Sequence, residues 1–460
     1  LSSVGPGRWP PIARLKRLAR RASRRVRSRQ KSGLSPASTG LLNWLKRLLT
    51  AANVGGLFSP QRLAMGMDSR EVTPVLTSAV VHLAAEIRSF ERVEITTEKV
   101  FGHKIARSTV RRLAKQVGEE LAELEVSNER VDDEEVIIPE VAVVSCDGGR
   151  IRTREPGQGR GVCLSNETGW RETKNASLEW MCLHDDHPGD SDPCPQLPTS
   201  FRTAEKVANI SEKPALIVEH ATDEKHDRVI YKGPRRVLRT AVSSMACSDD
   251  FGPMMQRETR RRRFYDARLK AFIGDGLNWN WSIWKKHFPT FTPILDFIHA
   301  IQYIFSAAIV VGSDEAEAWA IYVRLVTWCW QGRVDEVIEE FTSACQARGL
   351  DLAMQVADDD PVKPLYDAIR YLTNNRQRMD YPRYRQLGLP VTSAPMESLI
   401  KQINHRVKGT EMFWDDPDGA EAILQLRAAA LSEDGRLQRY LQTRPGWPFA
   451  RRTTQLTTAA

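Results

Sequence analysis

The spacing of apolar residues divides the chain into a helical segment, a strand-containing segment and a second helical segment. From about 73 to 124, apolar residues recur every three or four positions, which predicts helices. From 136 to 183 the pattern changes to β-branched runs and alternation, which predicts three sequential antiparallel strands. Gly148–Gly149 is the expected hairpin turn between the first two of these strands.

Two short apolar runs further along, 271–273 and 293–297, predict buried strands. Each run is followed by a helical pattern, so parallel strands joined by crossover helices are expected. Residues 200–265 are expected to form helix and loop, and 313–380 to be entirely helical. A last helical region is expected from Ser393 to about Leu441.

A helix-turn-helix is expected inside the first helical segment. Phe101–Lys104 supplies the turn, and Ser108 or Thr109 can cap the second helix. That helix has an apolar back and a basic front, as a recognition helix in the DNA major groove requires; the basic residues are Arg111, Arg112 and Lys115. An amphipathic helix with a solvated charged face explains the same pattern.

The chain is basic, with 66 Lys and Arg against 58 Asp and Glu, but the excess lies entirely at its beginning. Residues 1–67 contain fourteen basic residues and no acidic one, which leaves 52 basic against 58 acidic residues in the remainder. Such an arm is typical of contact with nucleic-acid phosphates. A solvated tail or an organelle transit peptide has a similar composition.

Length and composition exclude several other classes. A chain of 460 residues suggests two to four domains, and 41% hydrophobic residues suffice for a large core. No stretch approaches ~18 uninterrupted apolar residues, so no membrane span is expected. The seven cysteines are few and odd in number, which favours reduced thiols in a cytoplasmic protein over a disulfide framework.

Three further groups of residues each have two interpretations. One group is compatible with a zinc site or with a polar loop, and its irregularly spaced members are Cys182, His184, His187 and Cys194. Three tryptophans can either line a DNA channel or pack in the core, and they are Trp279, Trp281 and Trp284. The charge run from Arg257 to Arg263 fits either a phosphate contact or a solvated helix face.

Three acidic residues are placed where they can do chemistry. Asp147 and Asp275 each close an apolar strand and precede glycine, and Glu397 lies one turn into a helix that Ser393 can cap. Carboxylates held close together repel unless a cation neutralises them, and Mg²⁺ prefers such oxygen ligands. Each is also an ordinary residue for its position: a turn aspartate, or a glutamate paired with Lys401 at i,i+4.

The sequence around these carboxylates resembles the ISKra group of insertion-sequence transposases. The similar blocks occur in the order of that family and extend over about 73–441. They are Cys146–Arg154 with Trp170–Lys174, Ile273–Trp281, Gly388–Ser398, Arg406–Trp414 and Gly419–Arg427. The resemblance does not extend to the long basic arm, and 185–265 does not align with the family.

The resemblance implies an α/β fold with an RNase H-like mixed sheet, a large all-α insertion and a helical N-terminal DNA-binding region. It assigns Asp147, Asp275 and Glu397 as the catalytic triad and the ligands of two Mg²⁺ or Mn²⁺ ions. Asp296 and His299 match the Asp-x-x-His signature of related Mutator-like transposases, which carry a helical insertion before the final Glu. Just beyond Glu397, Arg406 and Lys408 are placed to contact DNA near the site.

Six parts of the chain follow from these observations. A basic arm and linker (1–72) precedes a helical DNA-binding region (73–135). Next come the first part of the core (136–312) and the helical insertion (313–380). The core is then completed by a segment with the Glu-bearing helix (381–445), and a tail (446–460) follows.

The function expected from the sequence is that of a DNA transposase in the bacterial cytoplasm, associated with the nucleoid. A DNA strand is cleaved at the end of the element, and the freed 3′-hydroxyl attacks target DNA. The expected partners are the terminal inverted repeats, target DNA and further copies of the chain, as a homodimer or higher oligomer. A catalytically inactive DNA-binding regulator and a metal-dependent nuclease without strand transfer remain the alternatives.

Overall fold

The computed structural model describes residues 72–102, 104–127, 137–154, 169–183, 233–353, 356–409 and 412–444. The basic arm, most of the zinc candidate (His184, His187 and Cys194) and the tail from 446 lie outside the described residues. Thr77–Leu441 forms one compact unit, and the chain on either side of it belongs to a second. The first unit is described below.

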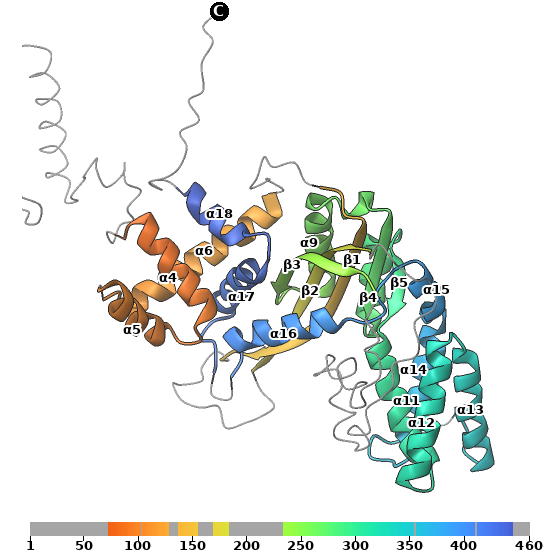
Figure 1. Cartoon of the computed structure of the whole chain (residues 1–460). Helices are drawn as coiled ribbons and strands as arrows, with labels where there is room; N and C mark the ends of the chain where they lie inside the picture. Colours follow the sequence, from red (N-terminus) through yellow and green to blue (C-terminus); the bar gives the residue numbers. More distant parts are fainter. Residues whose placement is uncertain are drawn as a thin grey trace, which may run out of the picture. The chain divides into compact units, whose positions relative to one another are not determined.

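A five-stranded mixed sheet forms the centre of this unit (Figure 1). Its order is β3-β2-β1-β4-β5, with β1 antiparallel to β2, β2 antiparallel to β3, and β4 and β5 parallel to β1. The strands are β1 (Val141–Arg152), β2 (Trp170–Cys182), β3 (Arg235–Ser244), β4 (Leu269–Gly274) and β5 (Thr292–Leu295). The expected mixed α/β fold and the two parallel crossover strands are therefore confirmed.

Two strand predictions were wrong. Gly148–Gly149 is not a turn, because β1 continues through both residues and pairs with β2 up to Arg152. A Cβ on Gly149 would lie 2.7 Å from Thr173 Oγ1, so glycine here serves the close approach of two strands. The third strand of the antiparallel part is β3, which lies in the region expected to be helix and loop.

Helices cover both faces of the sheet. On one face α16 (Ala394–Val407) lies across β1 and β2, and its Gln402 accepts a hydrogen bond from Arg239 of β3. On the other face α10 (Asn278–His287) reaches β1 through Asn280, whose amide donates to the backbone oxygen of Cys146 at 3.5 Å. The helix α9 (Ser248–Arg261) packs against α10.

The edge strand β3 is closed by the segment that follows α17 (Pro417–Leu431). Glu433 N donates to Arg239 O at 2.9 Å, and Ala241 N donates to Ser432 Oγ at 3.0 Å. Pairing and covering an edge in this way removes a free template for aggregation.

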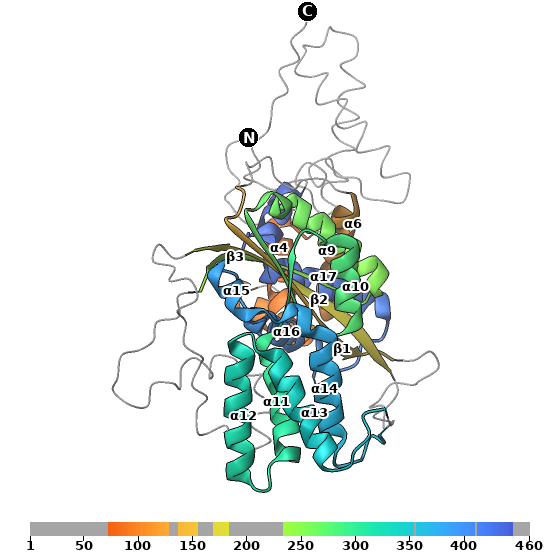
Figure 2. The same cartoon turned by 90° about the vertical axis from the view of Figure 1, so that its right-hand side faces the viewer.

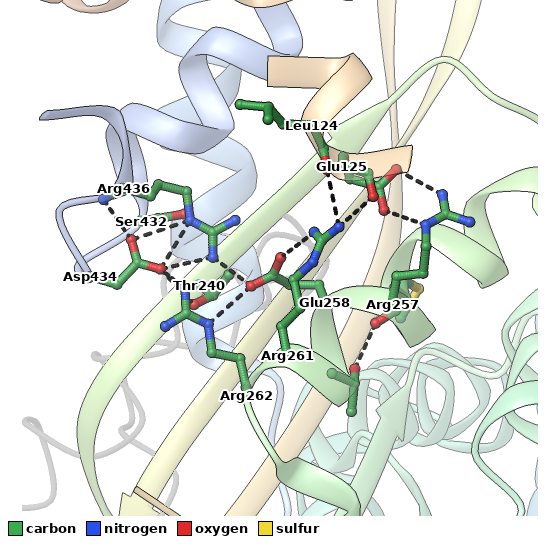
Figure 3. Close-up of polar contacts among 12 residues, drawn as sticks. Leu124, Glu125, Thr240, Arg257, Glu258, Arg261, Arg262, Ser432, Asp434 and Arg436 are labelled. Atoms are coloured by element: carbon green, nitrogen blue, oxygen red, sulfur yellow. Dashed lines mark hydrogen bonds and ion pairs between the residues drawn. The ribbon is translucent and has the colours of Figure 1, made fainter. Parts of the chain in front are cut away.

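The arginine run beginning at Arg257 forms a structural network rather than a free basic surface (Figure 3). Arg257 pairs with Glu125 at 2.7 Å, and buried Glu258 accepts hydrogen bonds from Arg261, Arg262 and Arg436. Asp434 pairs with two of the same arginines. These ion pairs join α9 to α6 (Arg107–Ser127) and to the turn between α17 and α18 (Arg436–Thr443). Neither interpretation offered for the run therefore describes Arg257, Arg261 and Arg262.

The helical insertion stands between β5 and α16. Its helices are α11 (Phe297–Val311), α12 (Glu315–Trp330), α13 (Val334–Ala347), α14 (Lys363–Asn375) and α15 (Tyr381–Gln386). Figure 2 shows α11 to α14 side by side as a bundle beyond one end of the sheet, in agreement with the contacts of α11 with α12 and α14. Helices were expected throughout 313–380, and they fill most of it.

The remaining helices are α4 (Pro74–Glu86), α5 (Phe90–Phe101), α6 (Arg107–Ser127) and α18 (Arg436–Thr443). The turn after α5 is present, with Gly102 in the left-handed region at φ 67°. Helix α6 begins at Arg107, so Ser108 and Thr109 lie inside it and do not cap it. Among the described residues, no helix is long and apolar enough to cross a membrane, and the five described cysteines are free thiols.

Candidate active site

The strand register brings aspartates to one row of the sheet. Ser145 of β1 pairs with Ile273 of β4, which pairs with Ile294 of β5. Two residues later, the same row carries Asp147, Asp275 and Asp296. Because Ser145 and Ile273 are paired, Asp147 and Asp275 follow at the same level on neighbouring strands, as the sequence predicted for strands that lie side by side.

The backbone around Asp275 is fixed from three sides. Its Oδ1 accepts hydrogen bonds from Leu277 N at 2.9 Å and from Asn280 Nδ2 at 2.5 Å. The Tyr371 hydroxyl donates to the backbone oxygen of Asp275 at 2.5 Å. Gly276 adopts φ 99°, and a Cβ there would lie 2.5 Å from the Tyr371 ring, so only glycine fits this turn.

Glu397 reaches the same edge from the helix across the sheet. Helix α16 begins after Ser393, with Pro395 in its first turn and Glu397 three residues into it. The apolar face of α16 is buried through Met396, Leu399, Ile403 and Val407. Glu397 is half-buried at the border of that face, as the sequence pattern predicted.

The electrostatics show that these groups share one environment. Burial, then the negative charges of Asp275 and Glu397, raise the pKa of Asp147 to about 7, although His299 opposes the shift. Burial also raises the pKa of Asp275 and of Glu397. The charge of Asp275 contributes to the raised pKa of both Asp147 and Glu397, and a cation relieves such repulsion between carboxylates.

Asp296 has a different role from the other carboxylates in the row. It is completely buried, and its oxygens accept hydrogen bonds from Ile298 N at 3.0 Å and from Ser393 Oγ. His299 Nδ1 lies 2.9 Å from Asp296 Oδ2. Burial lowers the pKa of His299, but the Asp296 hydrogen bond and nearby carboxylates outweigh it and raise that pKa to about 9. Ser393 thus bonds Asp296 and does not cap α16 through its side chain.

The donor set suits a hard divalent cation but is not closed around one. Asp147, Asp275 and Glu397 offer only carboxylate oxygens, the ligands that Mg²⁺ prefers. Within the part of the chain that is described, no three His, Cys, Asp or Glu side chains stand close enough together to hold a metal ion. Cys182, the one described member of the zinc candidate, belongs to no such group among the described residues.

The basic residues of α6 face carboxylates. Arg111 lies 3.5 Å from Asp416, and Lys115 lies 3.7 Å from the same carboxylate. Arg112 is half-buried. The back of α6 packs on α17, where Gly118 touches the backbone of Ala422. These side chains stay exposed or half-buried, so their role in DNA binding remains a prediction.

The assignment of Arg406 to a DNA contact was wrong. The residue is 0% exposed, its Nε donates to the backbone oxygen of Ala84 at 2.6 Å, and the rings of Phe90 and Trp414 lie 5.0 and 5.7 Å from its guanidinium carbon. A guanidinium enclosed in this way cannot reach a phosphate. Lys408 is half-buried and contacts Trp170, so its role is untested.

Core packing accounts for two of the three tryptophans. Trp281 is buried and donates its indole N–H to Asn375 Oδ1 at 3.0 Å, and Trp284 donates to the backbone oxygen of Phe291 at 2.9 Å. Trp279 is partly buried, 5.4 Å from the Lys174 ammonium.

Sequence reasoning missed two residues that hold the site. Asn280 stands inside the block that resembles the transposases, so its position next to Asp275 was a usable signal. Tyr371 lies 96 residues from Asp275 on α14, and nothing in the local sequence marks it.

Comparison with known proteins adds little. No protein-family model and no curated protein matches the sequence. Among solved structures, the chain is similar to a Drosophila P element transposase strand transfer complex, with a TM-score of 0.25 and 10% identity over 88% of this chain and 87% of that chain.

Proposed function

We propose that this protein is a DNA transposase of the insertion-sequence type. It would cleave a DNA strand at the end of its element and join the freed 3′-hydroxyl to target DNA. The order of the sheet and the helical insertion between β5 and α16 are compatible with an RNase H-like core. Because two element ends must be held together for transfer, we also propose a homodimer or higher oligomer.

One observation carries the proposal. Asp147 and Asp275 follow the last paired residues of neighbouring parallel strands, and Glu397 from α16 is close enough to raise the pKa of Asp147. These residues are 128 and 122 positions apart in sequence order. A site built from such distant segments, with oxygen ligands only, supports metal-assisted phosphoryl transfer.

The three carboxylates would hold two Mg²⁺ or Mn²⁺ ions, which supply charge neutralisation and Lewis acidity at the phosphate. Asn280 and Leu277 N fix one oxygen of Asp275, and this leaves the other oxygen as the donor toward the site. His299, protonated against Asp296, offsets part of the negative charge. No residue of the chain needs to form a covalent bond with DNA, because positioning and electrostatics supply the catalysis.

A strand-transfer assay tests the proposal. The substrate is a duplex of the genomic DNA that borders this gene, labelled at the 3′ end, with supercoiled target DNA and Mg²⁺. We expect labelled DNA joined to the target by the natural protein and no joining by Asp147→Asn or Glu397→Gln, with end binding retained. Asp335→Asn, an exposed site at 80%, is the matched control and should remain active.

Two outcomes would redirect the proposal. Cleavage without joining would indicate a nuclease. Binding to the ends without cleavage in either Mg²⁺ or Mn²⁺ would indicate a DNA-binding regulator.

A further inference from the structure

A cluster of positive charge surrounds Trp170 at the end of the β1–β2 pair. Arg152 lies opposite Trp170 in the strand register, and Arg150 is two positions earlier on the same face of β1. Their guanidinium carbons lie 4.6 and 5.3 Å from the centroid of the Trp170 ring. Lys408, just after α16, places its ammonium 5.5 Å from the same centroid.

Phe413 extends this arrangement along β1. Arg152 and Arg154 lie 5.4 and 5.6 Å from the centroid of its ring. Thr153 pairs with Trp414 in an isolated bridge, which fixes the loop that carries Phe413 beside the strand. We call the whole group the cation–aromatic surface, and its members are Arg150, Arg152, Arg154, Trp170, Lys408 and Phe413.

The way these cations are held leaves their charge available. An aromatic ring attracts a cation through its quadrupole and does not neutralise it, whereas a carboxylate does. Within the described part of the chain, Arg150 and Lys408 have no carboxylate partner, whereas Arg154 is paired with Asp415 at 3.1 Å. The surface therefore keeps a net positive charge that an anionic partner can use.

The arrangement favours phosphate contact over base stacking. A ring has two faces, and three cations lie within 5.5 Å of the Trp170 centroid, so this ring is not free to receive a base. Guanidinium groups spaced along a strand suit a regular phosphate backbone, which positions a duplex without reading its sequence.

We propose that the cation–aromatic surface binds the phosphate backbone of duplex DNA beside the reacting strand end, an inference that rests on the function proposed above. Arg150, Arg152 and Arg154 follow Asp147 by three, five and seven residues. At ~3.3 Å per residue, they lie about 10, 17 and 23 Å along the chain from Asp147, and the side chains of Arg150 and Arg152 leave β1 on the face opposite to that of Asp147.

Salt-dependent binding of a labelled 30-base-pair duplex to the full chain tests the surface. Arg150→Gln with Lys408→Gln removes two cations. If both contact phosphate, the slope of log K against log salt falls by about 1.8, and affinity at 0.1 M salt falls roughly tenfold or more. The matched control, Arg268→Gln with Arg370→Gln, removes two arginines that are 68% and 71% exposed elsewhere and should leave the slope unchanged.

A second variant tests whether the aromatic ring that holds the arginines matters when their charge is unchanged. Phe413→Leu keeps every cation but removes the ring over which Arg152 and Arg154 lie. We expect weaker binding with an unchanged salt slope. Thermal unfolding of each variant verifies that the fold is retained.

The outcomes test the proposed DNA contact of the cation–aromatic surface separately from the proposed transposase function. Suppose that the natural protein binds the duplex and that the double variant has the same affinity and salt slope as its control. The proposed DNA contact of the cation–aromatic surface is then overturned, and the transposase proposal stands. If the natural protein binds no DNA, both fail. Preference for an RNA duplex of equal length over DNA would also overturn the assignment.

Discussion

The hydroxyl of Tyr371, on helix α14 of the insertion, donates a hydrogen bond to the backbone oxygen of Asp275 at 2.5 Å. The Tyr371 ring is stacked on Tyr303 of α11, with centroids 3.8 Å apart and 13° between the ring planes. The same ring fills the space next to Gly276. The insertion therefore supports the turn that presents a proposed metal ligand, and its integrity matters for the site as well as for the fold.

Replacing Tyr371 with Phe tests this coupling. The variant keeps the stacked ring and loses one hydrogen bond, which contributes about 1 kcal/mol. We expect strand joining to slow by roughly five- to tenfold and the Mg²⁺ concentration for half-maximal activity to rise, with little change in Tm. Tyr303→Phe is the matched control because that hydroxyl makes no hydrogen bond to the described residues. Equal activity profiles for the two variants would show that Tyr371 does not position Asp275.

The contact of α6 with α17 gives a second prediction. A Cβ on Gly118 would lie 2.0 Å from the backbone oxygen of Ala422, and backbone cannot move aside as a flexible side chain can. Gly118→Ala should therefore destabilise the protein by about 3 kcal/mol or more, through overpacking. Gly148→Ala, whose Cβ would have no neighbour closer than 3.9 Å, should change the free energy of unfolding little. Urea denaturation measures both, and similar values for the two variants would contradict the close helix contact.

The network around Glu258 gives a third prediction, which includes a pH dependence. Burial raises the pKa of Glu258, but the charges of Arg436 and Arg262 outweigh it and hold that pKa well below the ordinary value of 4.5. The stabilisation is therefore present above about pH 4.5 and is lost as the pH falls below it. Glu258→Gln should cost about 3 kcal/mol at pH 7, the lower end for breaking a buried pair, because its arginine partners are about 20% exposed.

Denaturation of this variant at several pH values checks the sign. The difference from the natural protein should shrink between pH 4.5 and pH 3. A difference that is constant with pH would show that the charge of Glu258 is not the stabilising feature. Glu339→Gln, at an exposed position of α13, is the control.

The strands and the helix that carry the proposed triad could be predicted from the sequence because their patterns are local. Asp147 and Asp275 each follow a run of apolar residues, so the two strands are visible within about ten positions, although β1 does not end at Asp147 and continues to Arg152. The parallel pairing of β4 with β5 then follows from α10, the helix between them. The helix that carries Glu397 was predicted because its apolar face is periodic.

The errors come from contacts between distant segments. Arg406 appeared to be a basic residue on an exposed helix end, but its partner Ala84 is 322 positions away. Strand β3 contains three arginines and is stabilised by Ser432 and Glu433, about 190 residues further on. Neither pattern has a local hydrophobic period that reveals the burial, because the covering segment supplies it.

His299 gives the last prediction, a loss of stability at alkaline pH. Its hydrogen bond to Asp296 and the nearby carboxylates raise the pKa of His299 from 6.5 to about 9 against the effect of burial. A group with a raised pKa stabilises the folded state fully below 6.5, and this contribution is lost as the pH rises through about 9. The change corresponds to about 3 kcal/mol.

The natural protein, in EDTA to exclude bound divalent cations, should therefore lose about this much more free energy of unfolding between pH 6 and 10 than His299→Gln. His405→Gln, at an exposed position of α16, should follow the natural protein. Parallel pH profiles for all three proteins would mean that His299 is not held as a charged partner of Asp296, and that the negative charge of the site is not offset in this way.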